Sequence, residues 1–250
     1  MKFRILALAI AALTSGVAVA DSVSPATFVP GQTIQVGPQV EGGATVVYES
    51  FTGGTPTTTT GVPRTYEGGA ANLVAAGPQV DITAVTVYMA STAAGSYTNV
   101  RARIQLWDTY TQTATPIYSN PAGALITADL GPITTTANTF LTIPITLAIP
   151  VRLNSLTNKG FAVNFQVDTG AGLADSPDVT GLLTHTAAPT VGTNAVNAGN
   201  GFYRNASGRT DFNFIPADLR TFTGLVNTRL AVILTGQSTT PVSLQKFEVE

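Results

Sequence analysis

Apolar residues in this chain recur at every second position, and this spacing constrains the fold more than any other feature. The pattern is clear in residues 85–89, 100–107, 141–149, 161–167 and 230–234. A period of two places one apolar face of a β-strand on a shared core, whereas helical spacing is weak throughout. The abundant threonines fit, because β-branched side chains suit a half-buried pleated surface. The sequence therefore predicts an all-β fold, an antiparallel β-sandwich.

The length of 250 residues is compatible with one sandwich domain. We expect an N-terminal extension over residues 21–45 with one short strand near 33–36, a sandwich over 46–237, and a terminal strand or tail over 238–250. Residues 170–227 are poor in strand patterns, so they hold either short strands or a large functional loop. Pro144 interrupts a strand pattern, which predicts an edge strand or a bulge there.

The first 20 residues have the features of a secretory signal. Lys2 and Arg4 precede an apolar stretch over residues 5–13, and Ala18-Val19-Ala20 is a small-residue cleavage pattern. The apolar stretch is too short to span a bilayer, which takes about 20 residues. We predict cleavage after Ala20, a secreted or cell-surface location, and no membrane span in the mature chain.

Composition removes several classes of function. Only 10% of the residues are charged, against about 25% in a typical domain, and the formal net charge is −2. Without a basic excess, the chain is not expected to bind nucleic acid. The chain contains no cysteine, which excludes disulfides, thiol catalysis, zinc–thiolate sites and iron–sulfur clusters.

Several segments occur in an order known from one group of proteins. They are Val46-Val47-Tyr48-Glu49, residues 82–88, residues 100–107, Pro116-Ile117-Tyr118 and Gly201-Phe202-Tyr203-Arg204. In this the chain resembles bacterial secreted jelly-roll proteins, many of which carry a C-terminal PEP-type sorting tail. The resemblance implies an exported jelly-roll sandwich with a structural or surface role and brings no catalytic residues with it. The chain lacks the Pro-Glu-Pro motif, the C-terminal transmembrane helix and the arginine cluster, so anchoring by that route is not implied.

Candidate catalytic groups are few. His185 is the only histidine, and no Gly-x-Ser-x-Gly motif accompanies it. Paired carboxylates could hydrolyse a glycoside, and the acids on strands include Glu49, Asp108 and Asp168. Spacing cannot tell whether any two of them lie close together, and acids at strand ends also serve simply to keep loops soluble. We predict that the protein is not an enzyme.

Trp107, the only tryptophan, is the best candidate for ligand binding. By alternation it shares a sheet face with Arg103, and Asp108 and Tyr110 follow it closely. If this face is exposed, Trp107 can stack on a sugar ring while Arg103 and Asp108 bond its hydroxyls. The alternative is a covered face with an arginine stacked on the indole ring.

Three acids lie in a glycine-containing segment, Asp168, Asp175 and Asp178. Glycines permit a bend and carboxylates are calcium ligands, so a structural calcium site is one interpretation and a plain acidic loop the other. No other cofactor is expected.

The end of the chain has a further strand pattern, with apolar residues at Val242, Leu244, Phe247 and Val249. This segment either docks on its own sheet or pairs with another copy or another surface protein. Taken together, the sequence predicts an exported, non-enzymatic structural or cell-surface interaction protein, such as a matrix, fibre or adhesin-like component. The alternative is a stand-alone carbohydrate-binding module with a glycan as its partner.

Overall fold

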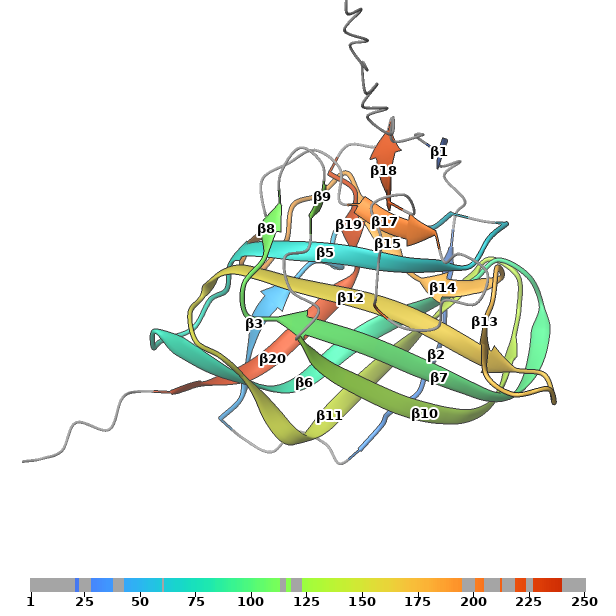
Figure 1. Cartoon of the computed structure of the whole chain (residues 1–250), viewed down its shortest axis with the longest axis horizontal. Coiled ribbons are helices and arrows are strands. Elements are labelled where there is room, and N and C mark those ends of the chain that lie inside the picture. Colours follow the sequence, from blue (N-terminus) through green and yellow to red (C-terminus); the bar gives the residue numbers. More distant parts are fainter. Residues whose placement is uncertain are drawn as a thin grey trace, which may run out of the picture.

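The computed structural model describes residues 21–22, 28–37, 43–59, 61–112, 116–117, 123–194, 201–204, 212, 219–223 and 227–239. All regular structure in these residues is β-strand, and the long strands pair antiparallel in two sheets packed face to face (Figure 1). The predicted all-β antiparallel sandwich is therefore confirmed.

Eight long strands form the framework: β3 (Thr45–Glu49), β5 (Arg64–Asn72), β6 (Gln79–Ser91), β7 (Gly95–Trp107), β10 (Ala124–Thr135), β11 (Thr139–Leu153), β12 (Thr157–Asp168) and β20 (Val232–Thr239). Their pairing is nested along the chain, with β7 on β10, β6 on β11, β5 on β12 and β3 on β20. Two sheets result. One, called the β6 sheet, has the strand order β3-β20-β6-β11, and the other, called the β7 sheet, has the order β5-β12-β7-β10. This arrangement is a jelly roll.

Short strands extend this framework at several edges. They are β1 (Asp21–Ser22), β2 (Val29–Thr33), β4 (Thr55–Thr57), β8 (Thr111–Gln112), β9 (Pro116–Ile117), β13 (Ala174–Asp175), β14 (Val179–Gly181), β15 (Leu183–His185), β16 (Thr193–Asn194), β17 (Gly201–Arg204), β18 (Leu219–Thr223) and β19 (Arg229–Leu230). The strand-poor stretch between β12 and β20 thus contains short strands. Three of the short strands form a separate small sheet in the order β19-β15-β4.

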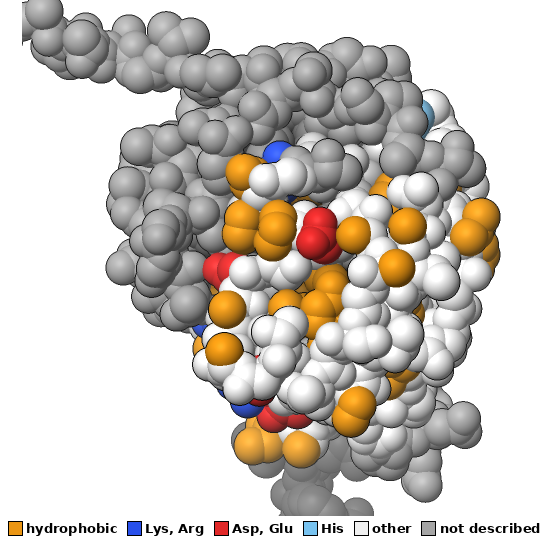
Figure 2. Space-filling model, turned by 90° about the vertical axis from the view of Figure 1, so that its right-hand side faces the viewer, with side chains coloured by type: hydrophobic (Ala, Val, Ile, Leu, Met, Phe, Trp, Pro, Cys, Tyr) orange, Lys and Arg blue, Asp and Glu red, His pale blue; other side chains and the backbone are white. Residues whose placement is uncertain are grey.

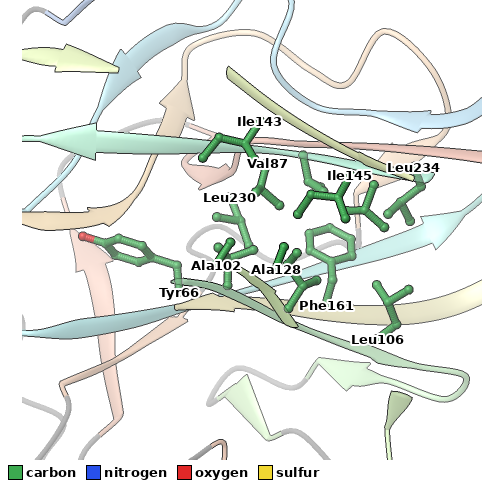
Figure 3. Packing of buried hydrophobic residues seen from close by; sticks show 14 of the residues in the cluster. Tyr66, Val87, Ala102, Leu106, Ala128, Ile143, Ile145, Phe161, Leu230 and Leu234 are labelled. Carbon is green, nitrogen blue, oxygen red and sulfur yellow. The ribbon is translucent and has the colours of Figure 1, made fainter. Parts of the chain in front are cut away.

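The core lies between the two long sheets (Figure 3). The β6 sheet contributes Val87, Ile143 and Leu234, and the β7 sheet contributes Ala102 and Phe161. The alternating apolar residues of β6, β7, β12 and β20 all point into this core, as the spacing predicts.

The alternation fails in the second half of β11. A strict period of two would bury Ile149, but its side chain is 82% exposed. Thr146 pairs with Ala84 whereas Val151 pairs with Ile82, so residues 147–150 form a bulge. Extra residues in one strand displace its side chains from the regular register, and Val151 then returns to the core side.

Pro144 lies in β11, the outermost long strand of the β6 sheet. The short strand β2 adds to β11 in parallel, and the Pro144 carbonyl accepts a hydrogen bond of 2.9 Å from the Val36 amide just beyond β2. The backbone polar groups of one strand residue point to the same side. The nitrogen of Pro144, which carries no hydrogen, therefore points toward the added strand, so the proline costs no hydrogen bond between β11 and β6.

The sandwich has two ends, which carry different connections. Those that follow β5, β7 and β11 lie at one end, called the Lys159 end below. Those that follow β3, β6, β10 and β12 lie at the other, called the Arg229 end. Buried polar side chains gather at both ends.

Candidate functional site

Trp107 shares the outer face of the β7 sheet with Arg103, as alternation predicts, and of the two alternatives for this face the structure shows the covered one. Its side chain is only 2% exposed, and neighbouring Gln105 is buried as well. Trp107 stacks on Tyr110, with ring centroids 6.5 Å apart and planes inclined by 25°. A Cβ added at Gly123 would lie 2.7 Å from the indole Cδ1, so backbone packs directly on the ring. The outer face is covered here, which alternation alone cannot reveal.

Arg103 stacks on the ring of Phe212 on this covered face. The guanidinium carbon lies 5.0 Å from the centroid of Phe212, whose side chain is buried. Phe212 is more than a hundred residues away in the sequence, so no local pattern identifies it as the partner. A cation over a ring face is stabilising, and more so where water is excluded.

Tyr110 connects this stack to a buried carboxylate. Its hydroxyl donates to Oε1 of Glu67 at 2.5 Å, and the Glu67 side chain is fully buried in β5. The ring passes close over Gly160, where a Cβ would lie 2.5 Å from Cδ2 of Tyr110. Sequence reasoning missed Glu67. The only signal was a single acid directly before the glycine pair at positions 68–69.

Asp108 belongs to a second polar cluster at the Lys159 end. The Lys159 ammonium, almost fully buried, donates to Oδ1 of Asp108 at 2.6 Å and also to the Asp108 carbonyl. Asn154 donates to the same carboxylate through its backbone amide at 2.8 Å and its side-chain amide at 2.6 Å. Burial alone would raise the pKa of Asp108, but these hydrogen bonds and the ammonium charge outweigh it and lower the pKa. Of the four residues predicted to bind a sugar, Trp107, Tyr110 and Asp108 thus lie in contacts that hold the loops of this end.

The Arg229 end contains a cation with a different environment. The Arg229 side chain is fully buried, and Nε donates to the Ser50 carbonyl at 3.0 Å. Nη1 donates to the carbonyl of Ala187 and, at 3.1 Å, to that of Asn227. Nη2 is buried without an acceptor. Sequence reasoning placed Arg229 in a strand pattern but did not anticipate its burial.

His185 lies close enough to Arg229 to respond to its charge. The imidazole is buried, and neither ring nitrogen has a hydrogen-bond partner in the described part of the chain. Burial, and after it the charge of Arg229, lower the pKa of His185. A catalytic histidine of the serine-hydrolase kind needs a carboxylate that stabilises its charged form, whereas Arg229 acts in the opposite direction.

The three candidate carboxylates for glycoside cleavage are engaged separately. Oε1 of Glu49 accepts the backbone amides of Phe51 and Thr52, each at 2.7 Å. Asp108 lies at the opposite end of the sandwich from Glu49 and Asp168, because β7 ends where β3 and β12 begin. Asp108 therefore cannot form a hydrolytic pair with either of them.

The predicted calcium ligands are not gathered into one site. Oδ1 of Asp168 accepts the amides of Gly170 at 2.6 Å and Gly172 at 2.9 Å, which lowers the pKa of this carboxyl. Asp175 pairs with Gln166 on β12, and the carbonyl of Asp178 accepts the amide of Thr92. Among the residues with described positions, no three His, Asp or Glu side chains are grouped so that they could hold a metal ion.

The predicted self-association residues Val242, Leu244, Phe247 and Val249 lie outside the described residues. Within the part of the chain that is described, no helix is long and apolar enough to cross a membrane.

No family model matches this chain, and comparison with curated proteins and with solved structures finds no significant match. Functional inference therefore depends on the fold and on the geometry of these clusters.

Proposed function

We propose that the protein is exported through its N-terminal signal and acts as a non-enzymatic structural or cell-surface protein. The observation that carries the proposal is the use made of its polar and aromatic groups. Trp107, Tyr110 and Glu67 are packed into one cluster, and Asp108 and Lys159 into another. Groups that could have carried chemistry instead hold loops on a jelly roll.

The surface supports a role in association. Two of its exposed cations are neutralised within the molecule, since Arg101 contacts Asp129 and Arg152 contacts Asp81, both at 2.7 Å. Figure 2 shows one end of the sandwich, where scattered apolar groups and uncharged side chains greatly outnumber the charged ones. A surface with little charge offers little repulsion to another copy. Jelly rolls build capsids and lectin domains, although the fold alone does not assign a function.

The resemblance to secreted jelly-roll proteins agrees with export and with a surface role. The alternative of a carbohydrate-binding module needs an aromatic platform open to solvent, and the candidate platform, Trp107 on Tyr110, is buried. We therefore do not propose sugar binding as the function.

The test is where the protein accumulates in a bacterial host. We expect it outside the cytoplasm, starting at Asp21, and accessible to protease added to intact cells. Leu8→Arg, which interrupts the apolar stretch of the signal, is the matched control and should leave the chain inside with Met1 intact. Accumulation of the unaltered chain in the cytoplasm with an uncleaved N-terminus would contradict the proposal.

A further inference from the structure

Near the Lys159 end, one side of the sandwich has exposed apolar side chains among the described residues. β10 and β11 are the adjoining edges of the two sheets and contact each other. Apolar residues line both edges there and are only partly buried or exposed. This line of residues, called the open seam below, consists of Ile126 and Leu130 on β10 and Leu147, Ile149 and Val151 on β11, and Leu125 lies beside it on the outer face of the same β10 edge.

The β10 side of the open seam is an unguarded strand edge. Residues 124–128 pair with β7 in unbroken register and carry no charge, and Leu125 is 53% exposed. Edge strands are usually protected by charges, prolines or bulges. The second half of β10 has all three, with Asp129, register shifts around Gly131, and Pro132. In the described chain β10 has no partner other than β7.

The β11 side shows that this edge accepts added strands. β2 pairs with residues 139–142 of β11, and a further bridge joins Val36 to Ile145. The hydrogen bonds described on this outer edge end at Thr146. The bulge with Ile149 begins directly afterwards, so the described part of the added strand reaches only to the start of the open seam.

The chain itself supplies a segment of suitable chemistry. β20 ends at Thr239, opposite Gln79, and Leu153 pairs with the adjacent Val80, so the chain leaves the β6 sheet at the Lys159 end (Figure 1). Ala124, the first residue of β10, lies at this end too. Residues 242–249 follow, with the apolar pattern of a strand.

We propose that residues 242–249 of one copy add as an extended strand to β10 of a second copy and cover its open seam. This interface rests on the proposed structural role and names the partner as the chain itself. The segment would obtain backbone hydrogen bonds from residues 124–128 and bury apolar side chains against Ile126 and Leu147.

Geometry favours a second copy over the chain's own seam. Val242 is three residues beyond Thr239, a reach of about 10 Å. A strand added outside β10 would be separated from β20 in two directions. Along the sheet it lies roughly three strand spacings away, which is about 14 Å, and across the sandwich it lies one sheet spacing away, which is about 10 Å. Residues 240–241 cannot bridge this separation and also reverse the chain. Between copies no such limit applies.

Disulfide trapping tests the pairing directly, because the chain contains no cysteine. Thr127→Cys, on an exposed position of β10, and Ser243→Cys are made in separate full-length chains, which are purified, mixed and oxidised. We expect a crosslinked heterodimer of the two chains in high yield. Val74→Cys, 55% exposed at the same end, replaces Thr127→Cys as the control and should give at least about tenfold less.

Three outcomes would overturn the proposal: no crosslink, equal crosslinking with the Val74→Cys control, or a crosslink that forms only within one chain carrying both cysteines. A second measurement uses light scattering after size-exclusion chromatography. Leu125→Lys should convert associated chains to monomers, whereas Val74→Lys should leave the association unchanged. Export is measured separately, so a chain that is exported but does not crosslink contradicts this interface and leaves the proposed function standing.

Discussion

Lys159 and Arg229 are cations buried at opposite ends of the sandwich, and their charges are neutralised differently. At one end the Lys159 ammonium contacts the carboxylate of Asp108, whose side chain remains 37% exposed. At the other, the Arg229 guanidinium bonds carbonyl oxygens of Ser50, Ala187 and Asn227, and one of its nitrogens has no partner among the described residues. The cation at the Lys159 end thus bonds an opposite charge directly, whereas the described hydrogen bonds of Arg229 go to backbone carbonyls and the charge of Glu49 acts on it through space.

This difference determines what each end depends on. A carbonyl cannot be protonated in the usual pH range, so the contacts of Arg229 to the backbone do not change with acidity. The neighbouring imidazole of His185 does titrate, and it lies beside a charge of the same sign as its own protonated form. The Lys159 end instead depends on the ionised state of one carboxylate. The two ends should therefore respond to different substitutions and to different ranges of pH.

The largest effect is expected from Arg229→Met. It removes the donor to the part-buried carbonyl of Ala187 and one of the two donors to the buried carbonyl of Ser50, and buried groups that lose a partner cost about 1–3 kcal/mol each. With lost packing of the side chain, we expect the free energy of unfolding to fall by roughly 3–4 kcal/mol. Equilibrium unfolding in urea measures it. Arg229→Lys keeps the charge but not the planar fork, so it should recover only part of the loss. A change under 0.5 kcal/mol would mean that the carbonyls find other donors.

A smaller effect is expected from Asp108→Ala, which leaves the Lys159 ammonium buried without its counter-charge. Breaking a fully buried pair costs about 3–5 kcal/mol, but solvent reaches this carboxylate and screens it, so we expect about 2 kcal/mol. Asp108→Asn retains an acceptor oxygen and should cost roughly half as much. Equal losses for both variants would show that the charge of Asp108 contributes little, and the contrast between the two ends would then disappear.

Acidity should distinguish the ends without any substitution. The folded-state pKa of His185 is lowered, so the unfolded chain binds a proton more readily as the pH falls through about 6.5. The contribution of His185 to the free energy of unfolding is fully present above about pH 6.5. Below that pH it declines, by at most about 1.4 kcal/mol per pH unit. The carboxyl of Asp108, whose pKa is also lowered, contributes stability that is lost only at lower pH, below about 4.

Urea unfolding at pH 7.5, 6.5 and 5.5 measures the histidine contribution. The unaltered protein should lose stability across this range, and His185→Gln should reduce the loss. Identical pH dependence in both proteins would remove His185 as the cause. Asp108→Asn, the matched variant at the other end, should leave the slope in this range unchanged.

Much of the fold follows from spacing alone, and the clusters do not. The core faces of β6, β7, β12 and β20 follow from alternation, since a period of two is a property of each strand by itself. The same rule finds no strand over β5, because nearly all its residues are buried on both faces and no alternation remains. It also places Ile149 wrongly, since a bulge shifts the register without changing the apolar pattern.

Burial of the outer face needs information that is distant in sequence. Alternation correctly assigns Trp107 to the face of Arg103, but it cannot tell what covers that face. The ring over Arg103 comes from Phe212, and Arg229 is enclosed by carbonyls from Ser50 and Ala187. Such partners are brought together by the nested pairing of the jelly roll, in which strands near the two ends of the chain lie side by side.

The smallest effect should come from an exposed ion pair, which gives the baseline for both buried cations. Arg101 contacts both carboxylate oxygens of Asp129, at 2.7 and 3.1 Å, and the two side chains are 35% and 55% exposed. The guanidinium hydrogen bond lowers the pKa of Asp129, yet solvent screens most of the attraction. A double-mutant cycle of Arg101→Ala and Asp129→Ala should give a coupling of about 0.5 kcal/mol, reduced further in 1 M salt. If the coupling reached that of Lys159 with Asp108, burial would not be what separates these pairs, and the stability of both ends would have to be attributed to backbone contacts alone.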